Sequence, residues 1–69
     1  MWFVVRAKID TEGQQANSIQ KYDNETQAYK RFYNILAADI DANNYTYELV
    51  QIVREDGIVI ASQVFKQEV

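Results

Sequence analysis

Several residue types that small domains use for stability or chemistry are missing from this chain. Its 69 residues include no cysteine, no histidine and no proline, and only 2 glycines. Without cysteine no disulfide can form, and without cysteine or histidine the commonest zinc ligands are absent. So few glycines also leave no glycine-rich loop for binding phosphate. A chain this short is one domain, residues 1–69, and small domains without disulfides or metals often gain stability by association.

Residues suited to catalysis or nucleic-acid binding are also scarce. No histidine is available as a general base, and most acidic residues fall at element ends, where carboxylates solubilise or bend the chain. Arg6 and Lys8 share one face of the first segment, but the net charge of −3 and the pI of about 4.7 oppose a phosphate-binding surface. We therefore expect a protein that is not an enzyme, holds no cofactor or metal ion and binds no nucleic acid.

Export or membrane insertion is not expected. The apolar run at residues 2–5 (WFVV) is followed by Arg6 and Lys8, and no small-residue cleavage site comes after it. No stretch approaches the ~20 apolar residues that a membrane span requires. We expect a cytoplasmic protein.

Alternation and turn residues predict four strands and one helix. The expected strands are Trp2 to Ile9, Gln15 to Tyr22, Tyr45 to Arg54 and Ile58 to Phe65, and the helix is Asp23 to Ile40. This order predicts a small α+β domain, ββαββ, with a mostly antiparallel four-stranded sheet and the helix packed on one face. The second strand is mostly polar and belongs at an edge. The first strand and one of the last two are the most apolar and belong at the centre.

The helix is expected to present one apolar side to the sheet. Its apolar residues recur at spacings of three and four: Ala28, Phe32, Ile35 and Leu36. Asp23 or Asn24 can cap its N-terminus. Tyr22, Tyr29 and Phe32 are expected where the helix meets the sheet.

Alternation divides the first strand into two sets of side chains. One set is apolar throughout, and we expect it to face the core: Phe3, Val5, Ala7 and Ile9. The other set begins with Trp2 and Val4 and then becomes basic. We expect Trp2 and Val4 on the face that the helix leaves uncovered.

The last two strands meet at Glu55-Asp56-Gly57, and Asp-Gly between apolar runs is a strong hairpin signal. A two-residue loop would pair Glu55 with Ile58, whereas a three-residue loop with a glycine bulge would pair Arg54 with Ile58. Both registers leave apolar side chains on both faces of the hairpin.

Two apolar sheet faces and one helix leave one face without cover. We therefore expect self-association, as a homodimer or a higher oligomer. Tyrosine and tryptophan are favoured at interfaces because they bury a large ring while the polar tip finds a partner. The residues expected at this interface are Trp2, Val4, Tyr33, Val50, Ile52, Val59 and Phe65.

One further pattern spans most of the chain. It begins with Met-aromatic-aromatic-Val-Val at residues 1–5. Lys21-Tyr22-Asp23 precedes the helix, which contains Ala28, Tyr33 and Leu36-Ala37. The pattern ends with the hairpin at Asp56-Gly57. In these features the chain resembles a group of short, mostly uncharacterised proteins encoded by phages and prophages of Gram-positive bacteria. Members often have histidine where this chain has Asn34, so a role that needs this histidine is not implied here. The resemblance implies a viral or mobile-element context and no mechanism.

Three functions fit these observations. The first is a non-enzymatic phage-type binding protein in the host cytoplasm, which self-associates and engages or inhibits a host protein such as a defence component. The second is an oligomer that sequesters a small, nucleotide-type ligand between subunits through tyrosine, arginine and backbone donors. The third is a structural or accessory component of the virion.

Overall fold

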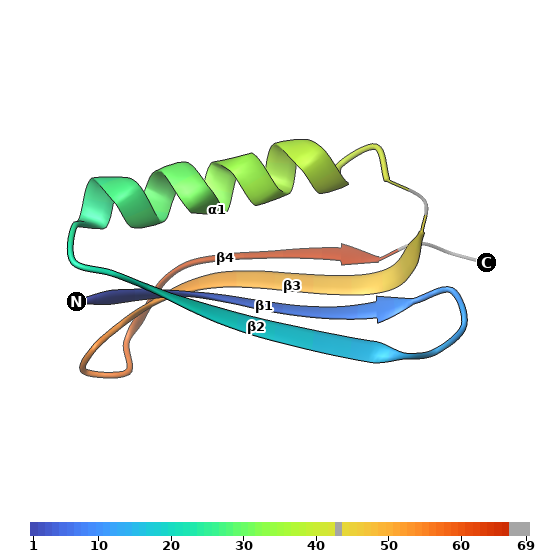
Figure 1. The fold of residues 1–69 in the computed structure, drawn as a ribbon, viewed down its shortest axis with the longest axis horizontal. Coiled ribbons are helices and arrows are strands. Elements are labelled where there is room, and N and C mark those ends of the chain that lie inside the picture. Colours follow the sequence, from blue (N-terminus) through green and yellow to red (C-terminus); the bar gives the residue numbers. More distant parts are fainter. Residues whose placement is uncertain (43, 67–69) are drawn as a thin grey trace.

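The computed structural model, which describes residues 1–42 and 44–66, is an antiparallel sheet with one helix lying along one face (Figure 1). Its elements are β1 (Trp2–Asp10), β2 (Gln15–Tyr22), α1 (Glu25–Asp39), β3 (Tyr45–Arg54) and β4 (Val59–Lys66). The four strands are ordered β2-β1-β3-β4, with every neighbouring pair antiparallel. The predicted α+β class and ββαββ order are confirmed. So are the central position of β1 and the edge position of β2.

The N-terminus of α1 is set by a side-chain cap. The Asn24 side chain accepts hydrogen bonds from the N–H groups of Thr26 and Gln27, at 2.8 and 3.3 Å. These N–H groups have no carbonyl partner within the helix, so the cap stabilises the first turn. Asn24, the second of the two predicted candidates, is therefore the N-cap, and the helix begins at Glu25.

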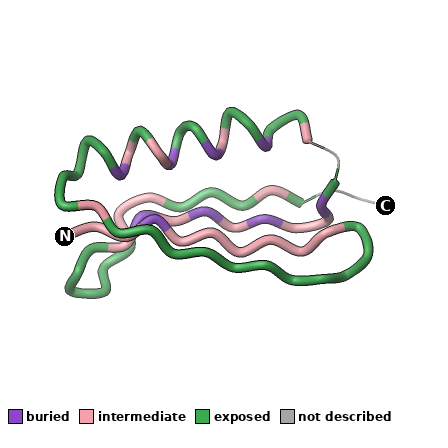
Figure 2. Tube along the Cα trace, in the orientation of Figure 1, coloured by how far each residue is buried: buried purple, intermediate pink, exposed green. Residues whose placement is uncertain are grey.

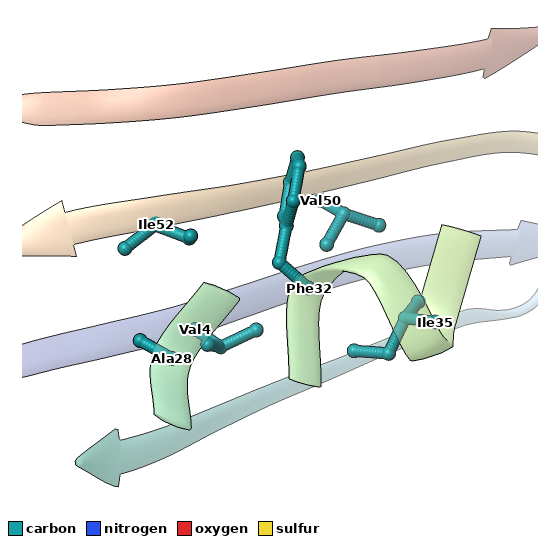
Figure 3. Close-up of a cluster of buried hydrophobic side chains, with 6 residues drawn as sticks. All are labelled: Val4, Ala28, Phe32, Ile35, Val50 and Ile52. Atoms are coloured by element: carbon teal, nitrogen blue, oxygen red, sulfur yellow. The ribbon is translucent and has the colours of Figure 1, made fainter. Parts of the chain in front are cut away.

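The hydrophobic core lies between α1 and the two central strands. Its buried members are Val4, Ala28, Phe32, Ile35, Val50 and Ile52 (Figure 3). Trp2, Tyr22 and Tyr29 are half-buried against this cluster. The prediction that Tyr22, Tyr29 and Phe32 lie where the helix meets the sheet is confirmed.

The helix covers the opposite face of β1 from the one predicted. Val4 is 2% exposed beneath α1, whereas the uninterrupted apolar set that begins with Phe3 lies on the face without a helix. The prediction is wrong because it assigned the face of β1 that carries Arg6 to the uncovered side of the sheet. Arg6 lies on the covered side, where two carboxylates pair with it.

The turn of the β3–β4 hairpin follows the three-residue alternative. The Arg54 N–H donates to the Ile58 carbonyl at 2.8 Å, and the Gly57 N–H donates to the Arg54 carbonyl at 2.9 Å. Gly57 has a φ of 87°, a conformation that glycine adopts without steric cost. The loop therefore consists of Glu55, Asp56 and Gly57.

A β-bulge then changes the register of the same hairpin. Val53 pairs with Val59, but Ile52 pairs with Ala61, so Ile60 is an extra residue in β4. Beyond it the strands follow the register predicted for the two-residue loop. The hairpin therefore has the three-residue register at its turn and the two-residue register beyond the bulge. The bulge places Val59 on the face opposite α1.

The molecule is thin for its length. Its Cα extents are 37 × 20 × 15 Å and its radius of gyration is 12.2 Å, whereas a compact domain of this size is expected near 11 Å. Figure 2 shows burial on the inner side of α1 and along β3, while β2 is exposed along nearly its whole length. This is the shape of a two-layer domain whose sheet is covered on one side.

A pair of charge insertions tests which face is internal. Val50→Lys is expected to unfold the domain, because Val50 is 0% exposed and a lysine there would be buried without a partner. Val64→Lys, on the opposite face and 41% exposed, is the matched control and is expected to stay folded. Circular dichroism and urea unfolding measure both variants. A cooperatively folded Val50→Lys variant would show that the helix covers the other face.

Candidate functional site

The sheet side opposite α1, which we call the open face, has no covering element among the described residues (Figure 1). Strand pairing arranges its side chains in four rows: Lys21–Phe3–Val53–Val59, Ile19–Val5–Gln51–Ser62, Asn17–Ala7–Leu49–Val64 and Gln15–Ile9–Tyr47–Lys66. The strands β1 and β3 form the middle of each row. Their side chains on this face are apolar except for Gln51 and the Tyr47 hydroxyl.

Charge on the open face is confined to two opposite corners. Lys21 is at the β2 edge of one end row, and Lys66 is at the β4 edge of the other; none of the positions in the four rows is acidic. The most exposed large apolar side chains of the open face lie on its edge strands: Ile19 at 67%, Val59 at 46% and Val64 at 41%. A central area without charge, with charged side chains only at two corners of the face, is the composition of an interface core.

The size of the open face can be estimated from strand geometry. Four strands spaced about 4.8 Å apart and eight residues rising about 3.3 Å each cover roughly 500 Å² in projection. Two such faces packed together would bury about 1,000 Å², which is where specific protein interfaces begin.

The predicted interface residues do not form one surface. Val4, Val50 and Ile52 are between 0% and 2% exposed, so the prediction that they face outward is wrong. Trp2 is half-buried on the covered side, as is Phe65, whose ring centroid lies 6.5 Å from that of Tyr45. Tyr33 is 60% exposed on α1, and Val59 is the one predicted residue on the open face.

A buried charge cluster lies beneath the C-terminal part of α1. Arg6 on β1 donates from Nε to Glu48 Oε1 and from Nη2 to Asp39 Oδ2, both at 2.6 Å. Glu48 on β3 is 0% exposed and Asp39 on α1 is 7% exposed. The Tyr45 hydroxyl also donates to the Asp39 backbone carbonyl, at 2.8 Å. One guanidinium therefore links the end of the helix to both central strands.

The cluster carries more negative than positive charge. Burial raises the pKa of Glu48 above its ordinary value of 4.5, and Asp39 raises it further, against the opposing effect of Arg6. Glu48 Oε2 is buried and has no hydrogen-bond partner among the described residues. Because the pKa is higher in the folded state, the folded protein binds more protons between pH 4.5 and that raised value. Stability from this group is complete at low pH and is lost as the pH rises through the folded pKa.

The contacts of the cluster join α1 to the two central strands. Both carboxylates are buried, and the Arg6 side chain, 27% exposed, is the most accessible member of the cluster. Within residues 1–42 and 44–66, no group of three or more potential metal ligands is placed to hold an ion. Asp39 is one of the acidic residues at element ends, for which the sequence predicts a solubilising or chain-bending role. The sequence signal for its buried position is its place in the core spacing, seven residues after Phe32.

A cavity of about 190 Å³ lies where the N-terminus meets the β3–β4 turn, lined by Met1, Trp2, Arg54, Glu55 and Asp56. Its charged groups already have partners. Arg54 pairs with Asp56, which lowers the pKa of the Asp56 carboxyl, and the Met1 amino group lies 3.7 Å from Glu55. The cavity therefore presents no unpaired charge that would select an ionic ligand.

Comparison with protein-family models, curated proteins and solved structures finds no match to this chain. The described part of the chain has no helix of the length and apolar character needed to cross a membrane.

The pH dependence of stability can be isolated at Glu48. Glu48→Gln is expected to stabilise the protein at pH 7, since glutamine needs no proton to become neutral. The advantage should shrink toward pH 4.5, the ordinary pKa of the carboxyl. Each unit by which folding raises the pKa corresponds to about 1.4 kcal/mol. Urea unfolding across this range measures the difference, with Glu12→Gln in the exposed β1–β2 turn as control. A difference that stays constant with pH would contradict this account.

The contribution of the Arg6 guanidinium to stability can be tested separately. Arg6→Met leaves two buried carboxylates without their cation, and we expect a loss of about 3–5 kcal/mol in the free energy of unfolding. Replacing all three members with apolar residues of similar volume should recover most of that loss, because no buried charge remains. Thermal and urea unfolding measure both variants. If Arg6→Met alone were as stable as the wild type, the cluster would not hold the helix to the sheet.

Proposed function

We propose that this protein is a non-enzymatic binding protein that self-associates, with two copies packing through their open faces. The observation that carries the proposal is the open face itself. Its central strands present eight positions on this face without a charged side chain, and nothing within the described residues covers them.

A second copy suits the open face in size and in composition. Two such faces reach about 1,000 Å² together, as specific interfaces require. Neither copy brings a charge to the central strands, so no ion has to be desolvated there. Sheets pack face to face about 10 Å apart, with side chains from both filling the space between them. The dimer would give each subunit the second apolar layer that the thin monomer lacks.

The stability of the subunit also favours association. Among the described residues, the cluster of buried apolar side chains in the single subunit has six members and adjoins the charge cluster of Arg6, Asp39 and Glu48. Domains of this size are marginal, and any partner that binds only the folded state stabilises it by mass action.

What the assembled protein binds is a further part of the proposal. A host protein is supported by the resemblance to phage proteins at residues 1–5 and 21–23. A ligand held between subunits is less favoured, because the open face offers few polar groups to orient it and the cavity near Met1 has its charges paired.

Sedimentation equilibrium across micromolar concentrations tests the self-association. The wild type is expected to be a dimer. Leu49→Lys, in the middle of the open face, should weaken dimerisation by at least 100-fold, about 2.7 kcal/mol, because the charge would be buried. Val64→Lys is a second disruptive variant at a more exposed position.

Gln63→Lys is the matched control. It adds the same charge to β4 on the covered side of the sheet, where Gln63 is exposed, and it should leave the dimer intact. A wild type that stays monomeric at all concentrations, or a Gln63→Lys variant that dissociates as readily as Leu49→Lys, would overturn the proposal.

A further inference from the structure

The open face contains one amide near its centre. Gln51 lies on β3, opposite Val5 on one side and Ser62 on the other. Along the strand, the nearest residues on the same face are Leu49 and Val53. Gln51 is therefore a polar side chain in mostly apolar surroundings, and it is half-buried already in the single subunit.

The Gln51 side chain makes no hydrogen bond to any described residue. A primary amide has two N–H donors and one carbonyl acceptor. Water can satisfy them in the free subunit, but an apolar cover would remove this water and leave the amide buried without partners, which is unfavourable. Whatever covers the open face has to supply both a donor and an acceptor at this point.

A second copy can supply both, provided that its own Gln51 lies there. Two primary amides form a reciprocal pair in which each Nε2–H donates to the Oε1 of the other. In a twofold-symmetric dimer, a residue beside the symmetry axis lies next to the same residue of the other subunit. Any axis lying between two fully overlapped open faces passes over the centre of the face. Gln51 is one of the four innermost positions, with Val5, Ala7 and Leu49.

We propose that Gln51 pairs with Gln51 of the second copy across the twofold axis and thereby sets the register of the dimer. This inference rests on the proposed self-association. The other central side chains are almost all apolar and would tolerate several offsets between the two sheets. An offset that separates the two amides leaves both buried without partners, so a single register is favoured. A buried polar residue specifies register in coiled coils by the same principle.

Variants of opposite charge at Gln51 test whether this residue lies next to Gln51 of the second copy. Gln51→Glu and Gln51→Lys, each alone, are expected to weaken dimerisation at least 10-fold because like charges meet at the axis. An equimolar mixture should form a heterodimer at least 10-fold tighter than either homodimer. Native mass spectrometry, with one variant carrying a mass label, measures the three species, and circular dichroism confirms that each variant is folded.

The same swap at Val59, which lies on the edge strand β4 and in an end row of the open face, is the matched control and should give a much smaller gain on mixing. One outcome would contradict the Gln51 pairing alone: the wild type dimerises and Leu49→Lys dissociates it, but the mixed Gln51 variants show no preference for the heterodimer. The proposed self-association would still be supported by that result. A monomeric wild type would contradict both the Gln51 pairing and the proposed self-association.

Discussion

One helix can cover only one face of a four-stranded sheet, and this constraint shapes the whole molecule. The 15-residue α1 lies along the sheet and buries Val4, Val50 and Ile52 beneath it. The opposite face receives nothing from the described part of the chain, although β1 and β3 are apolar on that side as well. The thin shape and the open face are two consequences of this shortage of covering structure.

The ion pairs of Arg6 lie on the sheet face that the helix covers. A basic residue in the middle of a strand would ordinarily point to solvent, yet here Asp39 and Glu48 neutralise it beneath α1. A buried ion pair adds less to stability than an apolar contact of the same volume, but it penalises arrangements that separate its members. The cluster thus fixes the helix end over β1 and β3 and leaves the purely apolar side of β1 available for contact.

The sequence predicts the elements of this fold well and their orientation poorly. Alternation, the Asn24 cap and the Asp56-Gly57 turn are local signals, and they place the strands and the helix within two residues of their observed limits. The covered face depends on contacts between residues far apart in sequence, such as Arg6 with Glu48, and no local pattern contains them. The expectation of an uncovered apolar face did not depend on that choice of side. The identity of the residues that form this face did depend on it, which is why Val50 and Ile52 were predicted at the interface and Val5 in the core.

The central claim is that a second copy covers the open face, and isotope-filtered NMR on a mixture of labelled and unlabelled protein tests it most directly. Intermolecular contacts are predicted from the methyl groups of Val5, Leu49 and Val53, with none from Val4, Val50 or Ile52. Contacts confined to the exposed side of α1, or no intermolecular contacts at a concentration where the sample is fully folded, would contradict the account.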